Sequence, residues 1–356
     1  MSVSLPRIRA VTLVLAFLAG FLLLATDAMA SNGVLYTQTN DPNGNTVQRF
    51  DRAADGSLTP AGTFATGGVG LAGLGGRQGA VELSGDGRYL YAVNAGSDTV
   101  SVFRAGHRRT RLVDTVGSRG VAPVSIAERH GRVYVLNSGG TPSVTAYRRL
   151  AGGSLWPIAT RELAPGAQGA AQVSVTPDGR ALVVTERLAN RLETLSLDRF
   201  GRPGAPVVTP SSGAVPFGFG ITRQGTIVVS EAGASSVSSY DLAGDGSLRT
   251  RTASLPVGQG AACWVAVSPN GRFAYTGNAA GGISGFAIGR DGSLTALGAP
   301  NLLPSPRDLD FDESGRYLHA VTSGGQVASY RVGSDGSLTL AGTAPAAAGL
   351  TGAAAL

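Results

Sequence analysis

The chain has 356 residues, its 29 basic residues are all arginine, and its formal net charge is +6. Without lysine it has neither a Walker-type phosphate loop nor a side chain for Schiff-base chemistry. The single cysteine, Cys263, excludes an internal disulfide. No aromatic residues interleave with the one tight basic cluster, His107–Arg111, which argues against nucleic-acid binding.

The first thirty residues have the composition of a secretory signal. Its parts are two positive residues, an apolar run and a small-x-small cleavage site, at Arg7 and Arg9, residues 10–25 and residues 28–30. The apolar run is shorter than the roughly 20 residues of a spanning helix, although a membrane anchor is the alternative interpretation. We therefore expect a signal peptide over residues 1–30 and one exported domain over 31–356, periplasmic or extracellular, with no membrane span after cleavage.

A repeated motif, Asp-Gly-Ser-Leu, organises the rest of the chain. It begins at Asp55, Asp245, Asp291 and Asp335, with a near copy at Gly152. The last three copies start 46 and 44 residues apart, and the earlier gaps are about twice as long. Degenerate copies are therefore expected between them, where HRRTRL (107–112) and RFGRPG (199–204) stand. Seven strand-rich units with this period predict an all-β, seven-bladed propeller.

The second unit shows what one blade contains. Four short strand-like runs, separated by turns, lie at residues 80–84, 89–94, 99–104 and 112–116. We name such strands A, B, C and D from the axis outward. The first unit lacks strand A, whereas the chain ends in a surplus segment, Gly349–Leu356. We predict that this segment closes the ring as strand A of the first blade, a frayed tail being the alternative.

Antiparallel pairing then localises a binding site. The A–B and C–D turns lie on one face of the disc, here called the turn face. The starts of strands A and the ends of strands B lie on the other, here called the loop face. Irregular loops on a rigid scaffold are the usual place for binding residues. The loop face is therefore where we expect a site.

The end of strand B carries asparagine in several blades and glutamate in two. The asparagines are Asn94, Asn137 and Asn278, and the glutamates are Glu186 and Glu231. Asparagine at this point typically closes a loop by bonding to the backbone. Two acids in its place suggest either a catalytic carboxylate at the channel or a pair neutralised by Arg187 and Arg191.

The starts of the A strands add a polar rim on the same face. Its candidate binding residues are Arg77, Gln78, Gln172, Gln259, Trp264, Arg307 and Asp308. Arg307 has the geometry to hold a carboxylate or phosphate bidentately. Trp264 is either a ligand platform or a residue packed between blades.

Other chemistries lack their residues. Gly68, Gly70 and Gly73 have the spacing of a dinucleotide fingerprint but not its strand–helix context. No histidine–cysteine set for zinc and no nucleophile elbow is present. The carboxylates and asparagines of the loop face would suit Ca²⁺, but no spacing requires it, so the sequence implies no cofactor.

The repeat units resemble a known family. The strings at Ser84–Phe103 and Ser268–Gly298 (SGDGRYLYAVNAGSDTVSVF and SPNGRFAYTGNAAGGISGFAIGRDGSLTALG) resemble the seven-bladed β-propeller lactonases. That family includes 6-phosphogluconolactonase-like proteins and carboxy-muconate lactonising enzymes. PFGFGI at Pro216–Ile221 looks like an exported subgroup of undefined substrate. Family members in the cytosol typically carry histidine at strand-A starts, whereas these A strands have none.

The resemblance implies a hydrolase that opens a lactone or a related cyclic ester. Glu186 or Glu231 would activate water, and Arg187 or Arg307 would stabilise the oxyanion. The asparagines and the polar rim would orient the substrate. The alternative is a non-catalytic scaffold that binds an envelope protein or polysaccharide. We expect a monomer whose partner is a small lactone or an envelope ligand, not nucleic acid.

Overall fold

The computed structural model describes residues 1–2, 33–71, 77–106, 109–298 and 305–356. The predicted signal segment lies almost entirely outside these residues, as do parts of the glycine-rich stretch and of the 107–112 repeat. None of the described residues forms a helix long and apolar enough to cross a bilayer.

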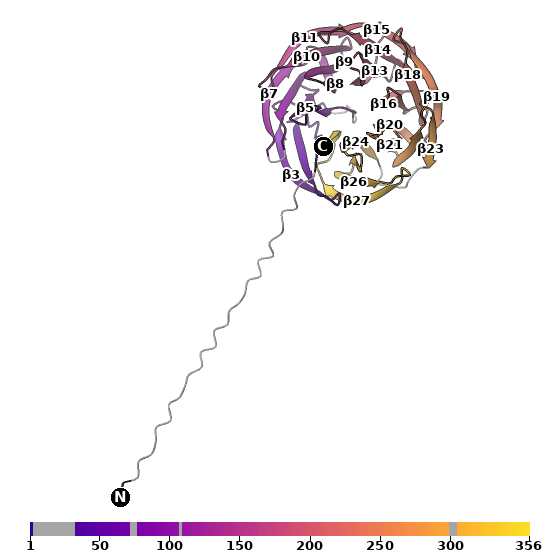
Figure 1. Ribbon diagram of the computed structural model, residues 1–356. Helices are drawn as coiled ribbons and strands as arrows, with labels where there is room; N and C mark the ends of the chain where they lie inside the picture. Colours follow the sequence, from indigo (N-terminus) through magenta and orange to yellow (C-terminus); the bar gives the residue numbers. More distant parts are fainter. Residues whose placement is uncertain (3–32, 72–76, 107–108, 299–304) are drawn as a thin grey trace. The chain divides into compact units, whose positions relative to one another are not determined.

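The described chain forms seven four-stranded antiparallel sheets, which confirms the predicted propeller. Figure 1 shows them arranged in a ring around a central axis, with β3, β7, β11, β15, β19, β23 and β27 outermost. Blade 1 contains β28 (Thr351–Ala355), β1 (Gly33–Gln38), β2 (Thr46–Arg52) and β3 (Leu58–Ala65).

The other six blades follow in chain order. Blade 2 contains β4 (Val81–Leu83), β5 (Tyr89–Asn94), β6 (Thr99–Arg104) and β7 (Arg111–Gly117). Blade 3 contains β8 (Val121–Arg129), β9 (Arg132–Gly139), β10 (Ser143–Arg149) and β11 (Leu155–Glu162). Blade 4 contains β12 (Ala170–Val175), β13 (Ala181–Glu186), β14 (Arg191–Leu197) and β15 (Pro203–Pro210). Blade 5 contains β16 (Pro216–Ile221), β17 (Ile227–Glu231), β18 (Ser236–Leu242) and β19 (Leu248–Pro256). Blade 6 contains β20 (Gly260–Val267), β21 (Phe273–Ala280), β22 (Ile283–Ile288) and β23 (Leu294–Gly298). Blade 7 contains β24 (Pro306–Phe311), β25 (Tyr317–Thr322), β26 (Gln326–Val332) and β27 (Leu338–Pro345).

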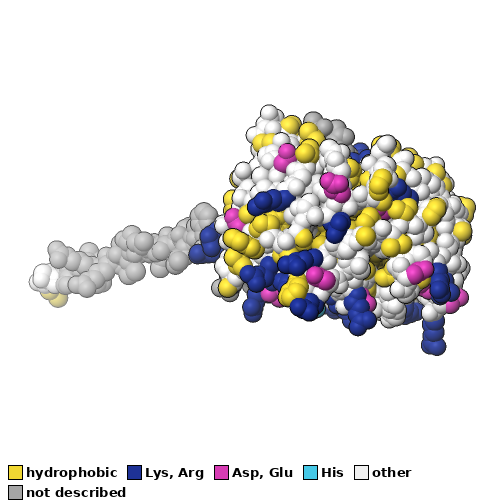
Figure 2. Space-filling model, turned by 90° about the horizontal axis from the view of Figure 1, so that it is seen from above, with side chains coloured by type: hydrophobic (Ala, Val, Ile, Leu, Met, Phe, Trp, Pro, Cys, Tyr) yellow, Lys and Arg dark blue, Asp and Glu magenta, His cyan; other side chains and the backbone are white. Residues whose placement is uncertain are grey.

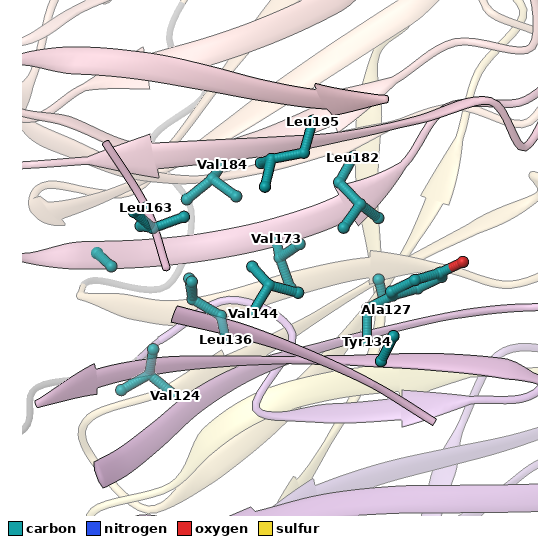
Figure 3. Packing of buried hydrophobic residues seen from close by; sticks show 12 residues of the cluster. Val124, Ala127, Tyr134, Leu136, Val144, Leu163, Val173, Leu182, Val184 and Leu195 are labelled. Carbon is teal, nitrogen blue, oxygen red and sulfur yellow. The ribbon is translucent and has the colours of Figure 1, made fainter. Parts of the chain in front are cut away.

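The core lies between neighbouring blades. Every residue of the second strands β5, β13 and β25 is buried, because both faces of these strands are covered by adjacent sheets. Figure 3 shows one such layer, in which Leu136 and Val144 of blade 3 pack with Val173 and Leu182 of blade 4. Each buried aliphatic side chain of this size contributes roughly 1.5–3 kcal/mol.

The repeated motif forms the C–D turn. In blade 1, Asp55 Oδ1 accepts hydrogen bonds from the Ser57 backbone N–H (2.9 Å) and hydroxyl (2.8 Å). Gly56 has a φ of 93°, a conformation that glycine adopts without strain. The degenerate copy after β14 forms a similar turn, with Asp198 Oδ1 accepting from the N–H groups of Phe200 and Arg202. The motif therefore serves the turn rather than the chemistry.

The C-terminal segment closes the ring, as predicted. β28 pairs antiparallel with β1, with Tyr36 opposite Ala354, and Figure 1 shows the C-terminus inside the ring. Its other edge is held by blade 7. There Asp308 Oδ2 accepts from the Ala353 N–H and Asp310 Oδ2 accepts from the Ala355 N–H, each at 2.9 Å.

Candidate functional site

The two strand-B glutamates are fully buried and hydrogen-bonded. Glu186 Oε1 accepts from Arg191 Nε at 2.9 Å, and Oε2 accepts from the Gln168 N–H at 3.0 Å. Arg191 also bridges to Glu193 (2.9 Å). Burial, followed by the neighbouring Glu186 side chain, raises the pKa of the Glu193 carboxyl. Arg191 therefore neutralises this pair, whereas Arg187 makes no ion pair with it among the described residues.

Glu231 lies in a nest of hydroxyl groups. Its Oε1 accepts from Ser211 Oγ (3.0 Å) and Tyr240 Oη (3.3 Å), and its Oε2 accepts from Ser236 Oγ (3.0 Å). A Cβ at Gly213 would lie 1.8 Å from Glu231 Oε2, so only glycine fits beside this carboxylate. Like Glu186, it ties the end of its B strand to the connection leading into its own blade.

The three asparagines at the ends of strands B, and Gln259, also make hydrogen bonds near the loop ends. Asn94 Nδ2 donates to Ser101 Oγ at 2.8 Å, and Asn278 Nδ2 donates to Ser284 Oγ at 2.9 Å. Asn137 Nδ2 donates to the carbonyl of Ser118 at 3.4 Å. Gln259 Nε2 donates to Ser284 Oγ at 3.2 Å, inside its own blade. These contacts favour the loop-closing interpretation of the predicted binding residues.

Two arginines of the loop face lie over one aromatic ring, and a third acts on the neighbouring thiol of Cys263. Arg77 and Arg187 lie over the ring of Phe217, with guanidinium carbons 5.5 and 5.3 Å from its centroid. Phe217 in turn meets Trp264 edge-on at 6.0 Å, and Trp264 is almost fully buried. The positive charges of Arg77, Arg187 and Arg307 act electrostatically on the thiol of Cys263. We call these three arginines the arginine cluster.

No described carboxylate neutralises the cluster. Burial, and then the charge of Arg187, lowers the pKa of Arg77 to about 10. Nε of Arg77 and Nε of Arg187 are buried without a hydrogen-bond partner among the described residues. Burial raises the pKa of Cys263 to about 11 in spite of these cations, so the thiol is not a nucleophile at neutral pH. The cluster is therefore suited to an anionic ligand.

The segment Arg77–Gly79 crosses between blades. The Arg77 N–H donates to Thr351 Oγ1 of blade 1 at 2.8 Å. Gln78 Nε2 donates to the carbonyl of Val265 in blade 6 (2.5 Å), and the Val265 N–H donates to Gln78 Oε1 (2.9 Å). The carbonyl of Gly79 accepts from the Ile126 N–H of blade 3 at 2.7 Å. We call this segment the cross-piece.

A second glutamine makes the same kind of contact. Gln172 Nε2 donates to the carbonyl of Phe219 at 2.9 Å, and the Phe219 N–H donates to Gln172 Oε1 at 2.6 Å. A Cβ on Gly218 would lie 2.3 Å from Gln78 Oε1, so any larger residue at position 218 would clash with the Gln78 side chain.

Carboxyl groups line a cavity beside both glutamines. It has a volume of about 90 Å³, and its lining includes Gln78, Gln172, Glu82, Asp308 and Asp310. Burial raises the pKa of Glu82 and of Asp308 well above the ordinary range, and that of Asp310 to about 7. We call this cavity the carboxyl chamber. Asp308 thus faces the chamber and β28 rather than an arginine.

Within the described ranges, no group of three or more histidine, cysteine, aspartate or glutamate side chains has the arrangement of a metal site. Sequence reasoning did not single out Phe217, Glu82 or the crossing contact of Gln78. Phe217 occupies an apolar strand position, and a contact between blades 2 and 6 has no local signature. The PFGFGI string was the one indication that this strand is unusual.

The turn face has a groove of its own. Its volume is about 560 Å³, and it is lined from blades 4 to 6 by Asp178, Arg223, Asp241, Arg251, Arg290 and Asp291 among others. In five blades the residue that follows the glycine of the A–B turn is an arginine: Arg88, Arg132, Arg180, Arg272 and Arg316. Figure 2 shows arginine side chains gathered along one border of the ring.

Comparison with known proteins gave one family. Its profile, described as lactonase, 7-bladed beta-propeller, matches residues 32–155, 133–263 and 231–350. A 6-phosphogluconolactonase candidate from Bacteroides uniformis is 18% identical with a TM-score of 0.76, over 91% of this chain and 99% of that one. A similar candidate from Bacteroides fragilis is 17% identical with a TM-score of 0.74, over 92% and 99% of the two chains.

The periplasmic gluconolactonase of Pseudomonas aeruginosa is 19% identical with a TM-score of 0.73, over 91% of this chain and 98% of that one. At these identities the solved structures establish a common fold alone. No curated protein matched the sequence.

Proposed function

This chain belongs to the lactonase family of seven-bladed β-propellers, and we propose that it is an exported hydrolase that opens a sugar lactone at the arginine cluster. The observation that carries this proposal is the set of three arginines, Arg77, Arg187 and Arg307, without a carboxylate partner among the described residues. A gluconolactone-like substrate agrees with the name of the Pseudomonas relative.

The chemistry requires stabilisation of a negative oxygen. Water attacks the lactone carbonyl carbon, and its proton passes to a base. The carbonyl oxygen becomes an oxyanion that the guanidinium groups of the cluster stabilise. The bond from carbon to the ring oxygen then breaks, and the ring oxygen takes the proton back from the base. The product is a hydroxy acid whose carboxylate suits the same arginines.

For the base we prefer Glu186 to Glu231. Glu186 precedes Arg187 directly in the chain, and Arg191 bridges it to Glu193, a carboxyl whose pKa is raised by burial. A neighbouring carboxyl that retains its proton closer to neutral pH can relay the proton that the base takes from water. Glu231 is held by hydroxyl donors and lies in the next blade. In this scheme the base acts when the loop at the end of β13 admits water.

The test is acid release from unphosphorylated sugar, aromatic and acyl lactones, with and without calcium, followed in a pH-stat. We expect Arg187→Gln to lower kcat/KM about 100-fold, the cost of one lost oxyanion donor. Arg180→Gln is the matched control, because Arg180 is 84% exposed and lies on the turn face. Glu186→Gln should abolish turnover with folding intact. Full activity in Arg187→Gln and Glu186→Gln would contradict this site.

A binding scaffold is the second candidate function. The polar groove of the turn face, about 560 Å³ in volume, is large enough for part of a polysaccharide. Absence of acid release from every lactone, together with binding of a polysaccharide that Arg223→Glu weakens, would favour this candidate over the hydrolase.

A further inference from the structure

The carboxyl chamber and the arginine cluster lie on either side of one short segment. Arg77 belongs to the cluster, and the next residue, Gln78, lines the chamber. We propose that Gln78 is a positioning residue, whose amide spans from blade 2 to blade 6 and keeps the charge of the arginine cluster available to an anionic ligand. The inference deepens the proposed function and rests on its assignment of the ligand site.

The chemistry of glutamine fits this position. Its side-chain amide has a donor and an acceptor, and Gln78 uses them on the carbonyl and the N–H of one residue, Val265. It thereby pairs with β20 as a neighbouring strand would, without adding a charge. Gly218 leaves room for the crossing, because a Cβ there would lie 2.3 Å from Gln78 Oε1.

The flanking backbone is fixed as firmly as the side chain. Thr351 Oγ1 accepts from the Arg77 N–H and donates to the Arg77 carbonyl (2.8 and 3.3 Å). The N–H of Gly79 donates to the carboxyl of Asp308. Strands of blades 1, 6 and 7 therefore set the position from which the Arg77 side chain leaves. Loss of the Gln78 contact would remove the one link to blade 6.

The separation matters because the cluster is cationic, whereas the chamber becomes anionic when its carboxyls ionise. Glu82, Asp308 and Asp310 line the chamber, and Glu128 and Asp312 act on this group electrostatically. If water and mobile side chains joined the two regions, ionised carboxylates would compete with a ligand for Arg77 and Arg307. On this proposal, the uncharged amides of Gln78 and Gln172, which both line the chamber, form an amide layer that prevents this.

The experiment compares Gln78→Leu with Gln48→Leu. Leucine has a similar size but cannot form the amide hydrogen bonds, and Gln48 is a glutamine outside the polar rim whose Oε1 accepts from the Ala347 N–H at 3.1 Å. Binding of gluconate is titrated by calorimetry at pH 7.5. We expect Gln78→Leu to weaken binding about tenfold and to raise KM more than it lowers kcat, since ligand recognition is lost. Gln48→Leu should change affinity less than about twofold. Equal affinity in Gln78→Leu and the wild type would overturn the proposal.

A pH series separates positioning from general loosening of the fold. Wild-type affinity for gluconate should stay nearly constant from pH 6 to pH 8, because the amide layer separates the chamber from the cluster. In Gln78→Leu the affinity should fall over this range as the chamber carboxyls ionise. A wild-type affinity that falls steeply over the same range would overturn the proposal even if the variant does not fold.

The remaining outcomes distinguish this inference from the proposed function. If the wild type binds neither gluconate nor inorganic phosphate, the inference about Gln78 is overturned, whereas the hydrolase is still decided by acid release. If it binds gluconate but hydrolyses no lactone, the hydrolase is excluded, and the role of Gln78 is still decided by the two titrations.

Discussion

The arginine cluster and the carboxyl chamber are two parts of one channel, and their ionisable side chains respond to burial in opposite ways. In the cluster, Arg77 and Arg187 stack on Phe217 and remain charged without a described counter-ion. In the chamber, Asp308 and Asp310 accept hydrogen bonds from β28, and burial raises the pKa of both. A buried charge without a partner is costly. The chamber side serves the closure of the ring, whereas the cluster side carries charge that no described carboxylate neutralises.

Removal of the closing strand is the strongest way to break this comparison. Deletion of residues 349–356 removes β28, and with it the donors to Asp308 and Asp310 and the partner of Arg77. Blade 1 would be left as three strands with an open inner edge. We expect the melting temperature to fall by more than ~10 °C, measured by calorimetry. An unchanged melting temperature would show that the ring does not depend on this strand.

Asp310→Asn tests the chamber alone. The folded-state pKa of Asp310 is about 7, above its unfolded value, so the folded state binds more protons between about pH 4 and pH 7. The stability that it contributes is full below pH 4 and is lost as pH rises to 7. We expect the variant to flatten this decline by about 2 kcal/mol in urea titrations at pH 5 and pH 8.

The matched variant for that measurement is Asp291→Asn, whose carboxyl is exposed in a C–D turn and has its pKa lowered by bonds from Ser293. A decline that is equally steep in Asp310→Asn and in the wild type would remove Asp310 as its source.

His319→Gln tests how the fold loses stability at acidic pH, and it has the smallest expected effect. His319 is fully buried in β25, opposite Asp310, and burial lowers its pKa to about 4. A histidine with a lowered folded-state pKa stabilises above its unfolded value near 6.5 and loses that contribution as pH falls to 4. The variant should lose less stability than the wild type between pH 6.5 and pH 4.5, by about 1 kcal/mol, in urea titrations. An identical acid slope would exclude His319.

Strand periodicity made the blades predictable. In blade 2 the expected runs at 89–94 and 99–104 coincide with β5 and β6, because their alternating residues and flanking turns are local features. The inner strand of that blade is shorter than expected, since β4 begins at Val81 after the cross-piece. Arg77, Gln78 and Asp308 were predicted at the starts of A strands, and all three contact strands of other blades. Which partners they would have was not predictable from their positions in the repeat.

Length, period and turn chemistry, all read from the sequence, determined the number of blades, the direction of their strands and the ring closure by the last residues. Each depends on contacts between residues close in the chain or on counting repeats. Only the tertiary structure decided that Glu186 pairs with Arg191, and that Gln78 crosses to Val265 while it lines the carboxyl chamber. The first contact lies within one hairpin, where the sequence left two arginines possible. The contact of Gln78 joins blades that the closure of the ring brings together, and such a contact leaves no period in the sequence.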